Sequence, residues 1–434
     1  MAAAGCMSSN PWGGHVKHVR SWAAVGLVVL LVAAPLSACG SSSKSKASDA
    51  GSTGSTVATS GTIKVGSIIP ATNTAGGIAL PQMRVALEAA VKGFNKRGGV
   101  AGKKLDLIVC DSKGDPNEEA NCARQMVTAK VAATLSDFTF FNGEADAKIL
   151  GDAGIPRIGI NTSALAEWHS PVTFALDAGP LAYFSGQGAE LIKQGHKKLA
   201  FVVVQTPQSG AIAALMKPGI KAAGGEIVTQ VFVPPGTTDY SRFVAAATKD
   251  GATGAVMALG YEQLSPFMDA MSQLNTKLVL GISANTPSLN QLEKYAKFTT
   301  RAVMVGTSPN VNSDPKEFPG LKLFVQDMKA GGLDIADVNG QSENPWVSVL
   351  ALKTVVEMAK PATVDAASVL AALKAAKDVD LQGMIPPWTP SRTDPSPIFT
   401  NISNPYVYAQ RFDGKSVQTV TPPINAMQIL DTKA

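Results

Sequence analysis

The side chains that most often perform catalysis are sparse in this chain and do not form a known catalytic pattern. Only four histidines occur in 434 residues. His15 and His18 lie near the N-terminus, and His169 and His196 lack the spacing of metal ligands. No His-Glu-x-x-His, Gly-x-Ser-x-Gly, Walker A or Gly-x-Gly-x-x-Gly motif is present. We therefore expect no enzymatic activity, no bound metal and no cofactor.

Two other patterns that could suggest chemistry have simpler explanations. Glu118 and Glu119 fall in the first turn of an expected helix, where the helix dipole favours acidic side chains. The Ser41-x-x-Lys44 pattern lies in a stretch of serine, glycine and threonine that cannot bury a core.

Length and composition indicate a folded protein with more than one domain. Of the 434 residues 45% are hydrophobic and 16% are charged, which suffices for a sizeable core. The net charge of +5 is modest and is not clustered, so nothing indicates a nucleic-acid surface.

The N-terminus predicts export and lipid anchoring. Lys17 and Arg20 precede an apolar run from Trp22 to Ala34 that is short for a membrane span. The sequence Leu36-Ser37-Ala38-Cys39 then resembles a bacterial lipobox, in which Cys39 is acylated. The alternative is an ordinary secretory signal with a chance cysteine. We expect residues 1–38 to be a signal peptide, and the protein to sit on the outer face of the cell membrane.

Residues 39–61 are rich in serine and glycine and should form a flexible tether. Beyond it, two cysteines remain in the mature chain, Cys110 and Cys122. In an oxidising compartment we expect them to form a disulfide. A catalytic redox pair would more often have the Cys-x-x-Cys spacing.

The first folded segment predicts a β-α-β-α unit. Residues Ile63 to Ile69 form an apolar run typical of a strand buried on both faces. A helix should follow from Pro81, ended by Gly98-Gly99, and Leu105 to Cys110 should form the next strand. Asp115-Pro116 then fits the N-cap and first position of a second helix.

This segment resembles the type I periplasmic binding proteins. The resemblance rests on Ile63-Lys64-Val65-Gly66, on the run from Phe94 to Leu105 that reads FNKRGGVAGKKL, on Cys110-Asp111 and on Asp115-Pro116. It is greatest to the branched-chain-amino-acid class of ABC-transporter substrate-binding proteins. Taken without the family, Gly98, Gly99 and Asp111 could simply terminate their elements.

Strand and helix patterns continue to alternate, which predicts an α/β fold of two doubly wound, Rossmann-like lobes. The resemblance implies that the chain crosses between them three times, near Pro180, Gly306 and Gly383, and so forms a hinge. We expect residues 62–180 and 307–383 in lobe 1, and residues 181–306 and 384–434 in lobe 2. Val407 to Phe412, Asp413-Gly414 and Val417 to Val420 predict a hairpin with a type I′ turn.

The resemblance also implies the ligand site. In the family, the loops after the third and fourth strands bind the ligand's carboxylate through backbone N–H groups and hydroxyls. The corresponding residues here are Phe138, Thr139, Phe140, Thr162 and Ser163. The phenylalanines could instead belong to the core, although aromatics so close together cannot all face one side of a strand.

Lobe 2 is expected to contribute Gln208, Tyr261 and Ser283, and Trp346 is expected at the start of a helix that borders the cleft. For Tyr261 and Trp346 a packing role is equally consistent with the sequence. Amino-acid binders of this class carry an acidic residue near Ser283-Ala284-Asn285, which pairs with the ligand's ammonium group. This chain has none there, so an α-amino acid is not fixed as the ligand.

We therefore expect a monomeric, lipid-anchored protein that binds a small organic molecule, either an amino acid or a related carboxylate or amide, and delivers it to an ABC permease. The first alternative is a receptor that binds a ligand and passes the signal to a partner. The second is an extracellular α/β enzyme, which would need a nucleophile–base pair or a metal site.

Overall fold

The computed structural model describes residues 61–72, 79–139, 141–162, 164–177, 179–205, 209–393 and 400–430. The predicted signal peptide, the lipidation site Cys39 and nearly all of the tether lie outside the described residues, as do Phe140, Ser163 and Gln208. No helix of the described part is long and apolar enough to span a membrane.

Lobe 1 is built on a parallel sheet of five strands in the order β2-β1-β3-β4-β5. β1 pairs with β2 on one side and with β3 on the other, so the strand order reverses beside β1. The strands are β1 (Thr62–Ile69), β2 (Lys104–Asp111), β3 (Thr134–Leu135), β4 (Arg157–Ile158) and β5 (Thr173–Phe174). The helices are α1 (Pro81–Lys96), α2 (Pro116–Ala129), α3 (Gly143–Asp152), α4 (Leu165–His169), α11 (Gly320–Ala330), α12 (Gly340–Ala359) and α13 (Ala366–Ala375).

Lobe 2 contains a sheet of seven strands in the order β12-β11-β10-β9-β8-β6-β7. Five strands are parallel, and the β11–β12 hairpin extends the sheet in antiparallel fashion. The strands are β6 (Lys198–Val204), β7 (Glu226–Val233), β8 (Gly254–Ala258), β9 (Val279–Ser283), β10 (Val303–Gly306), β11 (Tyr406–Phe412) and β12 (Val417–Asn425). The helices are α5 (Pro180–Lys193), α6 (Ser209–Ala222), α7 (Ser241–Ala247), α8 (Tyr261–Gln273), α9 (Leu289–Lys294), α10 (Ala296–Thr299) and α14 (Met427–Leu430).

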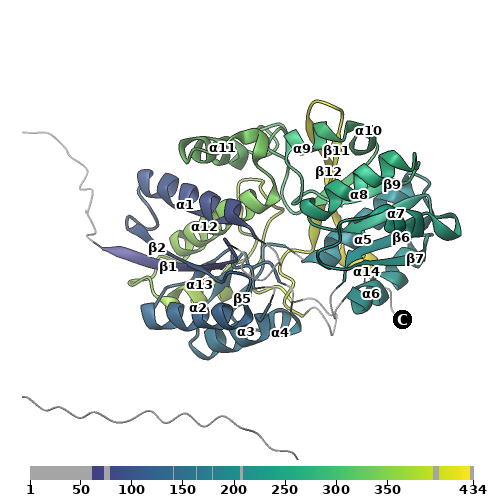
Figure 1. The fold of residues 1–434 in the computed structure, drawn as a ribbon. Coiled ribbons are helices and arrows are strands. Elements are labelled where there is room, and N and C mark those ends of the chain that lie inside the picture. Colours follow the sequence, from purple (N-terminus) through teal and green to yellow (C-terminus); the bar gives the residue numbers. More distant parts are fainter. Residues whose placement is uncertain are drawn as a thin grey trace, which may run out of the picture. The chain divides into compact units, whose positions relative to one another are not determined.

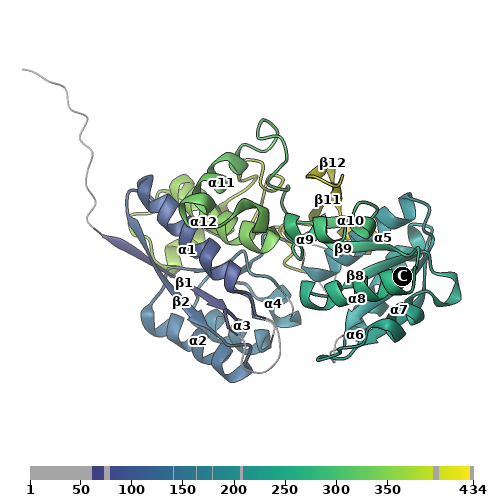
Figure 2. The same ribbon diagram turned by 45° about the horizontal axis from the view of Figure 1, so that its top comes forward.

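Helices cover both faces of each sheet, as Figures 1 and 2 show. In β6, Ala200 and Val202 pack in one buried cluster, whereas Leu199, Phe201 and Val203 pack in another. In lobe 1, α1, α11, α12 and α13 pack on one face of the sheet, and α2 and α3 on the other. This arrangement confirms the predicted doubly wound α/β architecture. Since both faces of β6 are buried, the strand is apolar at successive positions.

The opening β-α-β-α unit is confirmed element by element. Pro81 is the first residue of α1, and Gly98 and Gly99 follow its end with φ values of 99° and 70°. Asp115 caps α2, because its side chain accepts hydrogen bonds from the backbone N–H groups of Asn117 and Glu118. These features form as predicted because each depends on a few neighbouring residues.

Two local predictions were wrong. α12 begins at Gly340, six residues before Trp346, because Asn339 caps it and Pro345 is accommodated inside the helix. The hairpin turn is not type I′: only Gly414 of the pair Asp413-Gly414 has positive φ, and the Asp413 carboxylate accepts from the N–H groups of Lys415 and Ser416.

The connections between the lobes are held together by side chains. The Ser403 hydroxyl donates to the carbonyl of Ala175 at 2.6 Å, and the Asn404 amide donates to the carbonyl of Leu176 at 2.7 Å. Met384 and Trp388 belong to the buried cluster of lobe 1. We therefore place the proposed third crossing after Trp388 rather than at Gly383, where the sequence had suggested it.

Cys110 at the end of β2 and Cys122 in α2 form the predicted disulfide, with Cα atoms 5.5 Å apart. The bond fixes the edge strand of lobe 1 to a helix on one face of the sheet.

Replacing both cysteines with serine should lower the free energy of unfolding by about 3 kcal/mol, since the disulfide closes a short loop in the unfolded chain. Urea unfolding of the variant and of the wild type, each with and without reductant, measures this. A wild-type midpoint that does not move on reduction would contradict the disulfide.

Candidate ligand-binding site

The candidate site lies at the carboxyl ends of the strands in lobe 1, beside the point where the strand order reverses. Open α/β sheets bind ligands at such switch points, because neighbouring loops leave in opposite directions there. Two of the loops that meet here are 136–142, after β3, and 159–164, after β4. They are the loops that the sequence analysis singled out.

A buried group of charged side chains holds these loops in place. Arg157, on β4, is fully buried, and its guanidinium contacts the carboxylates of Asp137 at 3.2 Å and Glu167 at 3.3 Å. It also donates to the Thr139 hydroxyl at 2.9 Å, and that hydroxyl donates to Glu167. Because Arg157 has two buried carboxylate partners, it joins β4, the β3 loop and α4 in one network.

Asp137 has a structural role within this network. Its carboxylate accepts from the backbone N–H of Ile68 at 3.0 Å and from the Thr134 hydroxyl at 2.5 Å, as well as from Arg157. Its backbone carbonyl accepts from the N–H of Asn161 at 3.0 Å. Asp137 thus links β1, β3 and the β4 loop, and these bonds occupy its carboxylate.

Two further acids lie behind the β3 loop. Glu119, on α2, accepts hydrogen bonds from the backbone N–H groups of Phe141 and Asn142, at 3.2 and 2.7 Å. Asp146, on α3, is fully buried and lies near Glu119 and Arg157. Burial raises the pKa of both carboxyls, so the pair retains a proton near neutral pH. From the sequence we expected the helix dipole to explain Glu119. The structure gives Glu119 a further role, because its carboxyl group holds the loop after β3.

The first-lobe candidates that the structure describes, Phe138, Thr139 and Thr162, follow neighbouring strands at this edge of the sheet. Thr162 is 1% exposed, and its hydroxyl has no hydrogen-bond partner in the described structure. Phe138 is half-buried and packs against the core, while its N–H donates to the carbonyl of Ile68 at 2.8 Å. Thr139 faces the buried charged network. Ser136 has a φ of 53°, a left-handed conformation that is uncommon outside glycine and is frequent at functional sites.

The second-lobe candidates also follow strands. Tyr261 is the first residue of α8, directly after Gly260, and is partly exposed. Ser283 ends β9, and its hydroxyl accepts from the N–H of Asn285 at 3.3 Å. Both positions are at carboxyl ends of parallel strands, as the two-lobe arrangement requires.

Trp346 is not at a cleft. Its side chain is fully buried between Phe94 and Phe324, with ring centroids 5.4 and 5.9 Å away. Its indole N–H donates to Asp327 at 2.8 Å, and Asp327 also pairs with Arg97. The structure therefore favours the packing role that the sequence left open, and we withdraw Trp346 from the ligand-binding candidates.

A small polar cavity of about 10 Å³ lies where the first two connections between the lobes meet. There the Tyr183 hydroxyl lies 2.7 Å from both the Asp177 carboxylate and the Thr307 hydroxyl. Burial raises the pKa of Asp177 to about 6, although Tyr183 and the N–H of Gly179 favour its charged form. The cavity has room for about one water molecule, so it is a hinge contact rather than a ligand pocket.

The buried network was not predicted from the sequence. Its strongest signal was Arg157, a lone charge in the apolar stretch from Ile155 to Ile160. Since a charge inside a buried strand needs buried partners, this residue could have indicated that nearby acids are structural.

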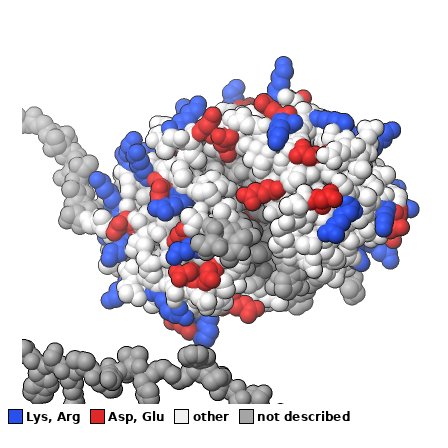
Figure 3. Space-filling model, in the orientation of Figure 1, with Lys and Arg blue, Asp and Glu red and all other residues white. Residues whose placement is uncertain are grey.

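Among the described residues, no group of three or more histidine, cysteine or acidic side chains is arranged to hold a metal ion. On the face drawn in Figure 3, acidic and basic side chains are interspersed.

Two doubly wound lobes with loops at the carboxyl ends of both sheets define the class of two-lobe ligand-binding proteins. Comparison with known families agrees. A family described as periplasmic binding protein matches residues 62–400, and the chain belongs to this family. The family predicted from the sequence is thereby confirmed. It is a family of extracytoplasmic solute-binding proteins rather than enzymes.

The chain is similar to Leu/Ile/Val-binding protein homolog 3 of Brucella melitensis, with 24% identity over 329 residues, 73% of this chain and 84% of that protein. Two solved structures share its fold. A leucine-binding protein of Thermotoga maritima has a TM-score of 0.67 at 16% identity, over 84% of this chain and 99% of that one. A solute-binding protein of R. palustris in complex with 4-hydroxybenzoate has a TM-score of 0.67 at 20% identity, over 84% and 97% of the two chains.

The Glu119–Asp146 pair predicts a pH-dependent stability. In the folded state the pKa values are raised to about 7 and about 8, above the ordinary values of 4.5 and 3.8. At pH values between the ordinary and the raised pKa values, the folded state binds more protons than the unfolded state. The stability that this pair contributes is therefore lost as pH rises. Relative to wild type, the variant Glu119→Gln with Asp146→Asn should gain stability as pH rises through this window, by about 1.4 kcal/mol for each unit by which the folded-state pKa values are raised.

Chemical denaturation of both proteins at a series of pH values measures the difference. Asp152→Asn, an exposed acid at the end of α3, is the control and should show a constant difference from wild type. A constant difference for the double variant as well would refute the shared proton.

Proposed function

We propose that this protein captures a small organic ligand between its two lobes and delivers it to an ABC permease. The observation that carries the proposal is the Thr162 hydroxyl, which is buried without a partner at the switch point of lobe 1. An unsatisfied buried hydroxyl costs about 1–3 kcal/mol. A ligand carboxylate or amide that bonds to it would recover this free energy.

Lobe 1 is suited to bind first. The buried network around Arg157 holds the β3 and β4 loops, so their backbone and hydroxyl groups need little reordering when a ligand arrives. Phe138 and Thr162 are the first-lobe ligand residues in this proposal, together with Phe140 and Ser163 of the same loops, whereas the Thr139 hydroxyl is already bonded to Arg157 and Glu167.

Lobe 2 would close over the bound ligand through Tyr261 and Ser283, with Gln208 from the loop after β6. Closure requires that ligand bind the closed form more tightly than the open form, because equal affinity for both shifts nothing. The crossings tied together by Tyr183, Ser403 and Asn404 would act as the hinge.

The ligand we propose is an amino acid or a related carboxylate or amide. A solved relative in fold from Streptococcus pneumoniae, the substrate-binding protein LivJ, is in complex with isoleucine, and the R. palustris protein is in complex with 4-hydroxybenzoate. The segment Ser283-Ala284-Asn285 offers no carboxylate to an ammonium group. We therefore expect carboxylates without an α-ammonium to bind more tightly than isoleucine.

Two measurements test the proposal. Native mass spectrometry of protein purified without refolding should find a small molecule carried through purification. Calorimetric titration with isoleucine, 4-hydroxybenzoate and 3,4-dihydroxybenzoate then ranks the classes. The absence of a bound molecule, together with no binding of any of these three compounds, would contradict the proposed function. Chemical conversion of a bound molecule would instead support the alternative of an extracellular enzyme.

Thr162→Val and Tyr261→Ala should each weaken binding of a ligand found in this way by roughly fivefold to 150-fold, since each removes a polar contact worth about 1–3 kcal/mol. Thr162→Ser keeps the hydroxyl and is the matched control. Small-angle scattering of the wild type should show compaction on ligand addition. Full-strength binding by both variants, or an unchanged radius of gyration, would show that the site is misplaced.

The anchoring proposal concerns Cys39 and the tether that follows it. Cys39→Ala should release the protein from the membrane fraction, because a single lipid-modified residue would supply the whole attachment. Cell fractionation with immunodetection measures this, and Cys6→Ala is the control. Tight membrane association of the Cys39 variant would refute the lipoprotein assignment.

A further inference from the structure

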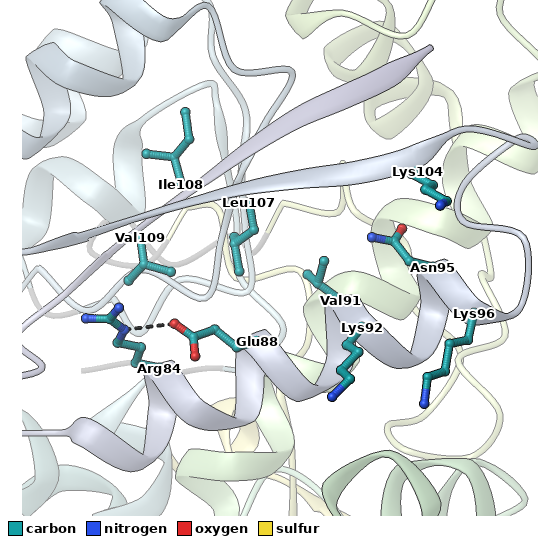
Figure 4. Close-up of a pocket in the computed structure, with 10 residues that line it drawn as sticks. All are labelled: Arg84, Glu88, Val91, Lys92, Asn95, Lys96, Lys104, Leu107, Ile108 and Val109. Atoms are coloured by element: carbon teal, nitrogen blue, oxygen red, sulfur yellow. Dashed lines mark hydrogen bonds and ion pairs between the residues drawn. The ribbon is translucent and has the colours of Figure 1, made fainter. Parts of the chain in front are cut away.

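A shallow groove of about 810 Å³ runs along lobe 1 between α1 and β2 (Figure 4). Leu107 and Val109 of β2 point towards α1, and Val91 points from α1 towards the strand. The side chains of Leu107 and Val109 are only partly buried. The groove therefore has an apolar floor that solvent reaches.

β2 is an edge strand, because among the described residues it pairs only with β1. Near its start, the backbone N–H and C=O of Leu105 bond to the Asn95 side chain, at 2.7 and 2.9 Å. These groups therefore face away from β1. Alternate residues of a parallel strand direct their backbone groups to the same side, so those of Leu107 and Val109 face the groove as well. The edge is covered at Leu105 and is available for pairing further along.

Basic side chains border this edge. Arg84, Lys92 and Lys96 lie along α1, and Lys104 lies at the start of β2. Among the described residues that line the groove, Glu88 is the one acid, and it pairs with Arg84 at 2.8 Å. Lys92, Lys96 and Lys104 are exposed, so the groove carries an excess of positive charge.

We propose that this groove binds an extended, acidic peptide segment of a partner protein, which adds to the lobe 1 sheet as a strand beside β2. Backbone pairing with Leu107 and Val109 supplies hydrogen bonds that do not depend on the peptide sequence. Carboxylates on the face towards α1 would lie near the basic residues that line the groove, Lys92, Lys96 and Lys104, which selects for an acidic segment.

A second copy of this chain fits the groove less well. Pairing of β2 with its own copy would bring two sets of the same lysines together, and like charges directly opposed are destabilising. The partner is therefore a different chain with the opposite charge. This inference stands apart from the proposed ligand site, because the groove lies on the outer edge of the lobe 1 sheet.

The test uses the full-length protein and a fluorescently labelled short peptide of alternating glutamate and valine. In a strand, this alternation places every carboxylate on one face. Anisotropy should detect binding of this peptide and not of the corresponding lysine–valine peptide. Amide hydrogen exchange followed by NMR should slow at Leu107 and Val109 when the acidic peptide is present.

Charge reversal at the groove, Lys92→Glu with Lys96→Glu, should weaken binding by about tenfold or more, since two exposed ion pairs become repulsive. Lys217→Glu with Lys221→Glu is the matched control, an exposed pair with the same spacing on α6, and should bind as wild type does. Leu107→Pro removes an outward-facing N–H at an edge-strand position, where proline is tolerated, and also removes the leucine side chain from the groove floor, so it should weaken binding as well.

Three outcomes would overturn the proposal. Equal binding by the groove variant and the control would place the peptide elsewhere. Binding to phosphatidylglycerol vesicles but not to the acidic peptide would make the groove a lipid surface. A dimer that the groove variant abolishes, seen by analytical ultracentrifugation, would make it a self-association surface.

Discussion

The candidate site depends on one buried cation. Arg157 is fully buried between Asp137 and Glu167, and Asp146 lies close by. Removing one partner of such an ion pair leaves an uncompensated buried charge and is strongly destabilising. Because its partners come from the β3 loop and from α4, the position of Arg157 determines where both loops of the first-lobe site lie.

The acids that surround Arg157 outnumber it, and the structure accommodates the excess by protonation. Glu119 and Asp146 together keep a proton because burial disfavours a second negative charge. The same Glu119 carboxyl accepts the backbone N–H groups of Phe141 and Asn142. The network therefore satisfies two backbone N–H groups of the β3 loop, whereas the Thr162 hydroxyl is one of several buried polar groups without a partner in the described structure.

Local sequence patterns predicted the elements that depend on local interactions. The Asp115 cap and Pro81 at the start of α1 are examples. Features that depend on distant contacts were missed. The family resemblance placed Trp346 beside the cleft and left a packing role open, and the sequence could not decide between them because its partners Phe94 and Asp327 lie on other helices.

The same limit applies to the site as a whole. The resemblance to a family identified the correct loops, since strand order determines which loops meet at the switch point. It did not distinguish the residues that hold the loops from the residues that face a ligand. Thr139, for example, bonds to Arg157 and Glu167, whereas Thr162 lacks a partner.

The central claim is that one small molecule contacts the loops of both lobes at once. Hydrogen–deuterium exchange with mass spectrometry, performed with and without a ligand that binds, tests it most directly. We predict simultaneous protection of residues 136–142 and 160–164 in lobe 1 and of residues 260–264 and 283–286 in lobe 2. Protection confined to one lobe, or lying outside these loops, would contradict the account.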